Sequence, residues 1–283
     1  MSICYLNGSF LNIEEAKISP LDRGFTFGDS IYEVIACYKK KPFKLKLHIE
    51  RLLKNLNSIK IDMNIDGSDI AEIIEQVIEK NDHENQVIYL QISRGFEHIR
   101  NHSPIENLKP TIFISSFPMM NIPELGQEPI EAILLDDFRW KRSNIKATSL
   151  LASVLYKIEA KEKNVTEVIL HDDGFITEGS ISNIFCVKDQ TIRTPSLESN
   201  ILPGVTRKVL LEIIKNNNFN FLETDVSIDD LVSSDEVWMT NTTKGIIPIS
   251  KIDQKYIVNK TSESLYGKIL ELFINEISAD RIQ

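Results

Sequence analysis

A proline-rich segment near the middle of the chain, residues 118–129, most limits how this sequence can fold. Its letters, PMMNIPELGQEP, include three prolines and one glycine and show no hydrophobic period. Neither a helix nor a strand continues easily through such a segment, which is typical of a domain boundary. At 283 residues the chain is also long for a single core. We therefore predict an N-terminal domain over residues 1–118, a linker over 119–129 and a C-terminal domain over 130–283.

Both predicted domains mix strands with helices. In the N-terminal domain, apolar stripes predict helices at 48–61 and 69–80. Runs of β-rich or alternating residues predict strands at 3–12 (with a turn), 32–38, 87–93 and 111–117. The C-terminal domain shows strand patterns at 130–135, 166–171, 182–187 and 237–240. It also has helical stripes over 202–214 and after Lys146, where we expect the inward residues to be Leu150, Leu151, Val154, Leu155 and Ile158.

Charge and cysteine content exclude several classes of protein. The formal net charge of −9 argues against nucleic acid or an anionic membrane as the main partner. The three cysteines are far apart and form no CxxC pair, so neither a disulfide framework nor a thiolate metal site is expected. The N-terminus has no secretion signal and no apolar run is long enough to span a membrane. A cytoplasmic protein is the expectation.

Lys146 has unusual neighbours. Arg139, Lys141 and Arg142 precede it and an apolar helical repeat follows. Nearby positive charge and burial both disfavour the protonated amine, so such a lysine is a candidate nucleophile. The alternative, a basic surface loop that leads into a core helix, is more common for a single lysine.

Two further cationic features are candidates for binding anions. Arg51 follows His48 by three residues, so both project from one face near the start of the 48–61 helix. The loop after the 87–93 strand carries Arg100 and His102, which suit a carboxylate and lack the ligand spacing of a zinc site. A solvated surface arginine and an ordinary polar hairpin loop are the alternatives, and we predict no metal site.

The C-terminal domain supplies an acid and hydroxyl groups. Glu178 precedes Gly179 and two serines, which suggests a carboxylate at a bend, presented into a cleft or merely part of a turn. Pro203-Gly204 leads into a helix that Thr206 can begin, and Thr242 follows the 237–240 strand. The free amides of a helix start and nearby hydroxyls suit a phosphate, although most helices begin in a similar way.

Together these groups match the needs of pyridoxal 5'-phosphate. That cofactor requires a lysine for a Schiff base, a carboxylate for the pyridine nitrogen and donors for the phosphate. A nucleotide-binding enzyme would need a glycine-rich fingerprint, and neither GxGxxG nor GxxxxGK[ST] is present.

Seven segments carry a resemblance to a known family. They are DRGFTFGDSIYEV, HIERL, SRGFEHIRNH, RWKRSNIKATSLLASVLYKIEA, EVILHDDGFITEGSISNIF, ILPGVTR and MTNTTKGIIPI, which follow one another from about residue 20 to 250. In these segments the chain resembles the class IV aminotransferases, the fold-type IV pyridoxal-phosphate enzymes. The resemblance implies an α+β protein with a small N-terminal α/β sandwich and a larger C-terminal α/β barrel-like domain. It also implies a homodimer whose active sites lie in interdomain clefts bordered by the other subunit.

The resemblance also implies roles for individual residues. Lys146 would form the Schiff base and shuttle the proton, and Glu178 would pair with the pyridine nitrogen. Residues around the phosphate would be Arg51, Val205, Thr206 and Thr242. The substrates would be small molecules, an amino acid and a 2-oxo acid, with no nucleic acid or membrane as partner.

Within the family, the chain is most similar to D-amino acid aminotransferases. In those enzymes a tyrosine at the position of Tyr32 and an Arg-x-His pair bind the α-carboxylate, which implies that Arg100 and His102 do so here. The sequence departs from their pattern at Asn241 and at Phe96-Glu97. We expect transamination between a D-amino acid such as D-alanine and a 2-oxo acid such as 2-oxoglutarate.

Three alternatives stay open at this point. The first is a 4-amino-4-deoxychorismate lyase, which releases pyruvate and 4-aminobenzoate and shares most of the motifs. The second is a branched-chain L-amino acid aminotransferase, a relative that lacks the Arg-x-His loop. The third is a non-catalytic protein that binds pyridoxal phosphate.

Overall fold

The computed structural model describes residues 2–63, 66–120, 122–125, 127–257 and 264–280. The chain forms two compact units, which we describe separately. The N-terminal unit comprises Met1–Met120, Ile145–Leu150 and Asp280–Gln283, and the C-terminal unit comprises Asn121–Asn144 and Leu151–Ala279. Two positions of the predicted linker, residues 121 and 126, lie outside the described residues. In the described ranges, no helix is both long and apolar enough to cross a bilayer.

The N-terminal unit is built on a six-stranded sheet in the order β2-β1-β6-β5-β3-β4. Every neighbouring pair in it is antiparallel. The strands are β1 (Ile3–Leu6), β2 (Ser9–Asn12), β3 (Ser30–Tyr38), β4 (Lys41–Pro42), β5 (Gln86–Ser93) and β6 (Thr111–Pro118). The helical elements are η1 (Ile13–Glu15), α1 (Arg23–Phe27), α2 (Leu45–Ser58) and α3 (Gly67–Glu79).

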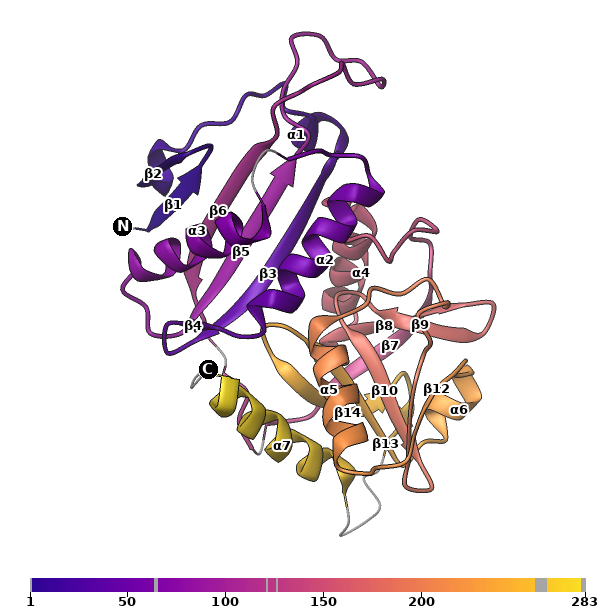
Figure 1. Cartoon of the computed structure of the whole chain (residues 1–283). Coiled ribbons are helices and arrows are strands. Elements are labelled where there is room, and N and C mark those ends of the chain that lie inside the picture. Colours follow the sequence, from indigo (N-terminus) through magenta and orange to yellow (C-terminus); the bar gives the residue numbers. More distant parts are fainter. Residues whose placement is uncertain (1, 64–65, 121, 126, 258–263, 281–283) are drawn as a thin grey trace. The chain divides into compact units, whose positions relative to one another are not determined.

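Helices α2 and α3 cover one face of this sheet (Figure 1). Side chains of β3 point alternately to the two faces of the sheet. Ile31, Ile35 and Cys37 join the core beneath the helices, while Tyr32 and Val34 face the other side. An Asp66–Asp69 capping box begins α3. The buried face of β3 also carries Glu33, an acid among apolar residues.

Residues 145–150 lie along β3, and this segment includes Lys146. The Tyr32 amide donates to the Lys146 carbonyl at 3.0 Å and the Thr148 amide donates to the Ser30 carbonyl at 3.1 Å. An isolated bridge joins Ile31 and Ala147. The backbone of Lys146 is therefore fixed by main-chain bonds to a central strand of the N-terminal unit.

The C-terminal unit contains a nine-stranded mixed sheet in the order β12-β11-β10-β13-β14-β7-β8-β9, with β15 paired to β14. Its strands are β7 (Ile130–Asp136), β8 (Glu167–Asp172), β9 (Phe175–Gly179), β10 (Asn183–Lys188), β11 (Thr191–Thr194), β12 (Phe221–Glu223), β13 (Glu236–Asn241), β14 (Gly245–Ile252) and β15 (Lys255–Tyr256). The helices are α4 (Leu151–Glu162), α5 (Val205–Asn216), α6 (Ile228–Val232) and α7 (Leu265–Asp280).

This second sheet curls. Strand β9 ends the sheet and β10 lies near the opposite edge, yet the two strands contact each other and the Gly179 amide donates to the Ser182 carbonyl. A flat sheet would keep strands at those positions far apart. The predicted α+β class, with a sheet-and-helix N-terminal part and a barrel-like C-terminal part, is confirmed.

The predicted inward face of α4 is wrong. The helix packs on the sheet through Tyr156 and Ala160, which meet Val168 and Leu170 of β8. The stripe predicted to be buried is instead exposed, at 72% for Leu151; its other members are Leu150, Val154, Leu155 and Ile158. An apolar stripe shows that one side of a helix avoids water, but it does not say whether the same chain covers that side.

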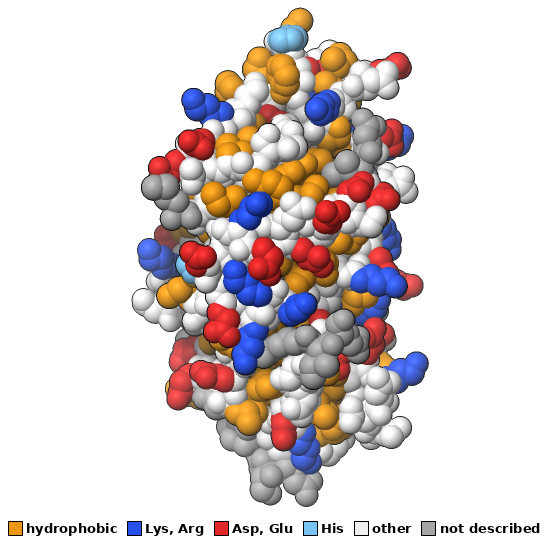
Figure 2. Space-filling view, turned by 60° about the vertical axis from the view of Figure 1, so that its left-hand side comes forward, with side chains coloured by type: hydrophobic (Ala, Val, Ile, Leu, Met, Phe, Trp, Pro, Cys, Tyr) orange, Lys and Arg blue, Asp and Glu red, His pale blue; other side chains and the backbone are white. Residues whose placement is uncertain are grey.

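Figure 2 shows one face of the molecule, where acidic and basic side chains are interspersed and hydrophobic side chains gather in patches. Two local predictions also need correction. Glu178 lies within β9 and not at a bend, although the β8–β9 register is irregular where Glu178 lies, between the Ile169–Gly179 and His171–Ile176 pairs. Helix α2 begins at Leu45 rather than at His48.

Candidate active site

Lys146 lies close to Tyr32 in the N-terminal unit. Its Nζ is 4.2 Å from the centroid of the Tyr32 ring, and both side chains are half-buried. A cation above an aromatic face is attracted by the ring quadrupole. Of the cations that precede Lys146 in the sequence, Arg139 is paired with Asp137 and Glu178, and Lys141 is paired with Asp172.

A buried acid–base cluster lies under the sheet at Glu33, His48 and Arg51. Arg51 donates to both Glu33 carboxylate oxygens, from Nε at 2.8 Å and from Nη2 at 2.7 Å, and His48 Nδ1 lies 2.8 Å from Glu33 Oε2. Burial alone would raise the pKa of Glu33, but the Arg51 charge and hydrogen bonds prevail and lower it to about 2. Burial lowers the pKa of His48, so the neutral imidazole donates its Nδ1–H to Glu33.

This cluster gives Arg51 a different setting from the expected one. Because α2 begins at Leu45, Arg51 is in the second turn of the helix and not at its start. Its guanidinium is buried rather than solvated, and it is fixed by a two-pronged bond to Glu33. Glu33 was not identified from the sequence, although its place on the buried face of β3 was a signal that it needs a cationic partner.

The predicted carboxylate-binding residues share one aromatic neighbour. The Arg100 guanidinium lies 4.3 Å from the centroid of the Phe27 ring, and the His102 ring centroid lies 5.2 Å from it. Phe27 is the last residue of α1, which ends at Gly28 in a left-handed conformation with φ +66°. The N-terminal unit therefore brings Arg100 and His102 together at one helix end.

The C-terminal unit contains a second buried cluster, around Glu178. Arg139 donates to Glu178 Oε1, while Glu178 Oε2 accepts from Asn183 Nδ2 at 3.0 Å and from the Leu202 amide at 3.1 Å. Arg139 is also clamped by Asp137, with Nε–Oδ1 at 2.9 Å and Nη2–Oδ2 at 2.6 Å. Burial raises the pKa of Glu178 to about 7 even though Arg139 opposes that shift.

Asn183 joins Glu178 to the start of α5. Its Nδ2 also donates to the Leu202 carbonyl at 2.9 Å, and a Cβ added at Gly204 would lie 2.1 Å from its Oδ1. The prediction that Thr206 begins α5 is wrong, because the helix begins at Val205 and its N-cap is Gly204. Gly204 provides no side-chain cap, so the first amides of the helix, at Val205 and Thr206, have no such partner. Only glycine allows this helix start to approach the Glu178 cluster so closely.

Strand β13 passes the same cluster, because Thr240 pairs with Asn183 across the ladder. The buried Thr240 hydroxyl has no hydrogen-bond partner in the described part of the chain. Thr242 follows two residues later and is half-buried. Buried hydroxyls normally find a partner, so an unsatisfied one beside the Glu178 cluster points to a polar ligand.

The C-terminal cluster fits pyridoxal phosphate. Asp137, Arg139 and Glu178 together carry one net negative charge when ionised, and a protonated pyridine nitrogen would balance it. The α5 start presents uncapped amides, which suit a phosphate. The N-terminal unit holds Lys146, Tyr32, Arg51, Arg100 and His102, and the C-terminal unit holds Glu178, Val205, Thr206 and Thr242.

Sequence comparison places this chain among known aminotransferases. The family model described as "Amino-transferase class IV" matches residues 30–252. A D-alanine aminotransferase of Staphylococcus epidermidis is 37% identical over 254 residues, which cover 89% of this chain and 90% of the relative. A D-alanine aminotransferase of Bacillus licheniformis is 35% identical over 251 residues, covering 89% and 88%.

Solved structures share the fold over almost the whole chain. The Escherichia coli branched-chain amino acid aminotransferase matches with a TM-score of 0.90 at 25% identity and covers 99% of this chain and 95% of its own. A T.th. branched-chain aminotransferase solved with N-(5'-phosphopyridoxyl)-L-glutamate matches at 0.89 with 25% identity, covering 99% and 95%. A putative 4-amino-4-deoxychorismate lyase of Legionella pneumophila matches at 0.86 with 20% identity, covering 93% and 97%, which shows the fold alone. The fold-type IV architecture is confirmed.

Proposed function

The chain belongs to the class IV aminotransferase family, and on that premise we propose that it transfers the amino group of a D-amino acid to a 2-oxo acid with pyridoxal 5'-phosphate. D-alanine and 2-oxoglutarate are the proposed representative substrates. The observation that carries this proposal is the match to D-alanine aminotransferases over about nine-tenths of both chains. The retained Tyr32, Arg100 and His102 support it.

The proposed cofactor supplies an aldehyde for condensation with amines and a ring that withdraws electrons from the substrate. Lys146 is the proposed attachment point, and its Nζ takes the proton from the substrate Cα. Glu178 holds a proton at the pyridine nitrogen, a task suited to a buried carboxylate whose pKa is near 7. The Val205 and Thr206 amides and the Thr242 hydroxyl bind the phosphate.

Arg51 is proposed to act at the phosphate together with its partners. Its bidentate bond to Glu33 fixes the direction of the guanidinium, and His48 holds the second Glu33 oxygen. A cation fixed in this way keeps its position without losing side-chain freedom when an anion binds. The α-carboxylate of the amino acid is proposed to bind Tyr32, Arg100 and His102.

The proposal is tested first on the purified wild-type protein. We expect a visible absorbance band, and borohydride reduction should leave a pyridoxyl group on Lys146 that peptide mass spectrometry locates. D-alanine with 2-oxoglutarate should yield pyruvate and glutamate, and Lys146→Ala should abolish this while Lys141→Ala, in the exposed part of the same segment, should not. Pyruvate formed only from aminodeoxychorismate would overturn the transaminase in favour of the lyase.

A homodimer is also proposed. The exposed apolar stripe of α4 supports it, because contiguous exposed apolar side chains mark surfaces that contact another protein. Light scattering behind size-exclusion chromatography should give twice the 32.4 kDa mass of the chain. Leu151→Glu combined with Leu155→Glu should yield monomers, whereas a dimer that survives both charges would show that another surface joins the subunits.

A further inference from the structure

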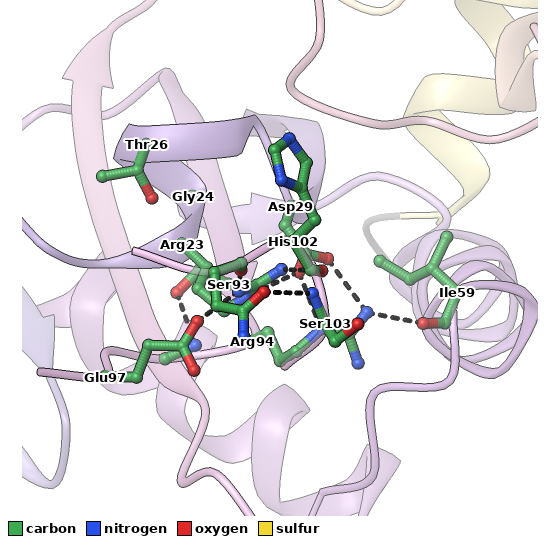
Figure 3. A network of polar contacts seen from close by, with 12 residues as sticks. Arg23, Gly24, Thr26, Asp29, Ile59, Ser93, Arg94, Glu97, His102 and Ser103 are labelled. Atoms are coloured by element: carbon green, nitrogen blue, oxygen red, sulfur yellow. Dashed lines mark hydrogen bonds and ion pairs between the residues drawn. The ribbon is translucent and has the colours of Figure 1, made fainter. Parts of the chain in front are cut away.

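The loop that carries Arg100 and His102 is attached to α1 by a buried polar network (Figure 3). Four charged residues form its centre: Arg23 of α1, Asp29 just after α1, Arg94 just after β5, and Glu97. Arg23 Nε donates to Asp29 Oδ2 at 2.9 Å, and Arg94 donates to both Asp29 oxygens at 2.7 and 2.9 Å. Two cations and two carboxylates balance in charge.

Arg23 binds the loop directly. Its Nη1 donates to the Asn101 carbonyl at 2.6 Å and to Glu97 Oε1, and its Nη2 donates to the His102 carbonyl at 3.1 Å. These carbonyls belong to the two residues that follow Arg100. One guanidinium, only 3% exposed, therefore determines where the backbone at Arg100 and His102 lies.

Glu97 binds the loop from the other side. Its second oxygen, Oε2, accepts from the Ile105 amide at 3.4 Å. Glu97 is buried, although the side chains of residues 98–107 are exposed. The apolar side chains of this loop do not hold it in place, since Ile99 is 76% and Ile105 is 61% exposed. Polar bonds to Arg23 and Glu97 fix the loop backbone, in addition to the contacts of the Arg100 and His102 side chains with Phe27.

Arg94 resembles Arg23 in chemistry but holds a different part of the unit. Beyond Asp29, it donates to the Ile59 and Lys60 carbonyls after α2, each at 2.7 Å. In the described part of the chain its side chain makes no hydrogen bond to residues 98–107. The network therefore contains two arginines on one carboxylate, the buried Arg23, which binds the loop, and the half-buried Arg94, which does not.

We propose that Arg23 and Glu97 are positioning residues that set the substrate-carboxylate affinity by fixing the loop on which Arg100 and His102 lie. This inference rests on the proposed function, because Arg100 and His102 must bind the carboxylate. Glu97 belongs to Phe96-Glu97, one of the two places at which the sequence departs from the D-amino acid aminotransferase pattern.

The test compares Arg23→Lys with Arg94→Lys. Each keeps a positive charge beside Asp29, and each loses a fork of donors. We expect Arg23→Lys to raise the KM for D-alanine at least about tenfold with kcat little changed, since a small displacement of binding groups is costly. Arg94→Lys should lower the unfolding temperature to a similar extent and leave the KM as in wild type. Glu97→Gln, which keeps an acceptor for Ile105, should raise the KM less than Glu97→Ala.

Hydrogen exchange measured by mass spectrometry on the cofactor-free protein gives a second readout, independent of activity. Peptides that cover residues 98–107 should exchange faster in Arg23→Lys than in wild type or Arg94→Lys. Equal KM increases in both arginine variants would mean general destabilisation and overturn the inference, as would faster exchange without a KM change. A wild-type protein with no activity on D-amino acids would instead overturn the proposed function and remove the substrate role from this loop.

Discussion

Each unit contains a buried glutamate bonded to an arginine, and the pKa values of the two glutamates are shifted in opposite directions. Glu33 and Glu178 are both buried and both bonded to an arginine, yet the pKa of Glu33 falls to about 2 and that of Glu178 rises to about 7. The difference lies in how each arginine is shared. Arg51 donates two bonds to Glu33, whereas Arg139 is held in a two-pronged bond by Asp137 and gives Glu178 a single nitrogen.

The remaining partners add to this contrast. His48 also bonds to Glu33, while the other partners of Glu178 are the neutral amide groups of Asn183 and Leu202. Asp137 moreover adds a negative charge that raises the pKa of Glu178 further. Burial penalises both carboxylates, and the two bonds from Arg51 outweigh that penalty at Glu33 while the one nitrogen of Arg139 does not at Glu178. The Glu33 cluster therefore keeps its carboxylate ionised, whereas the Glu178 cluster allows its carboxyl group to hold a proton.

The largest effect on the unfolding free energy is expected when the Glu33–Arg51 pair is broken. Glu33→Gln removes the carboxylate charge that accepts two bonds from the buried Arg51, which costs about 3–5 kcal/mol of unfolding free energy. Urea unfolding of the cofactor-free protein at pH 7 measures it. Glu178→Gln is the matched control, because Arg139 keeps Asp137 and should not destabilise the protein comparably. Equal losses in the two variants would show that sharing of the arginine is not what separates the clusters.

This contrast also shows what the sequence could and could not reveal. Lys146 and Glu178 could be proposed as site residues because each lies in a motif of neighbouring residues. Strand-like runs predicted several strands of both sheets, but not β11, β12 or β14. The partners were not identifiable, because Glu33 meets Arg51 and Arg139 meets Glu178 across long stretches of chain that only the fold brings together. The burial of the α4 apolar stripe was predicted wrongly for a related reason. Such a stripe indicates that another surface covers it, but not whether that surface belongs to the same chain.

The second prediction concerns pH. Because Glu178 has a folded pKa of about 7, above its ordinary 4.5, the folded protein binds more protons than the unfolded chain between these values. Stability from this group is therefore present below pH 4.5 and falls by about 3 kcal/mol as the pH rises to 7. Unfolding of the cofactor-free protein across this range should show the fall in wild type but not in Glu178→Gln. Parallel curves for the two proteins would contradict the raised pKa.

Glu33 should give the opposite slope in a separate window. Its folded pKa of about 2 lies below the ordinary 4.5, so its contribution is present above pH 4.5 and is lost as the pH falls toward 2. The same titration therefore separates the two glutamates within one protein. In Glu33→Gln the acid limb of the curve should flatten while the limb between pH 4.5 and 7 remains.

The third prediction concerns a substitution that makes the surroundings of Glu178 more like those of Glu33. Asp137→Asn removes the competing charge and leaves the Arg139 charge to Glu178 alone, which should lower the pKa of Glu178 by roughly one unit. The midpoint of the Glu178-dependent stability curve measures the change. Thr177→Val is the control, since Thr177 Oγ1 donates to Asp137 Oδ2 at 2.8 Å and its loss alters no charge. A midpoint that stays near 7 in Asp137→Asn would mean that burial alone sets the value.

The smallest effect is expected at the neutral partner of Glu33. His48→Phe keeps a ring in the buried site but removes the donor to Glu33 Oε2, which should cost about 1 kcal/mol of unfolding free energy. Because burial lowers the pKa of His48 below its ordinary 6.5, the contribution of His48 itself is lost as the pH falls below 6.5. In wild type this loss partly offsets the gain from Glu178, so the stability of His48→Phe should rise more steeply than that of wild type as the pH falls from 6.5 to 4.5. His48→Gln, which can donate again, should recover most of the loss at pH 7. If His48→Phe instead cost as much as Glu33→Gln, the imidazole would be carrying charge, and Arg51 would not be the group that keeps Glu33 ionised.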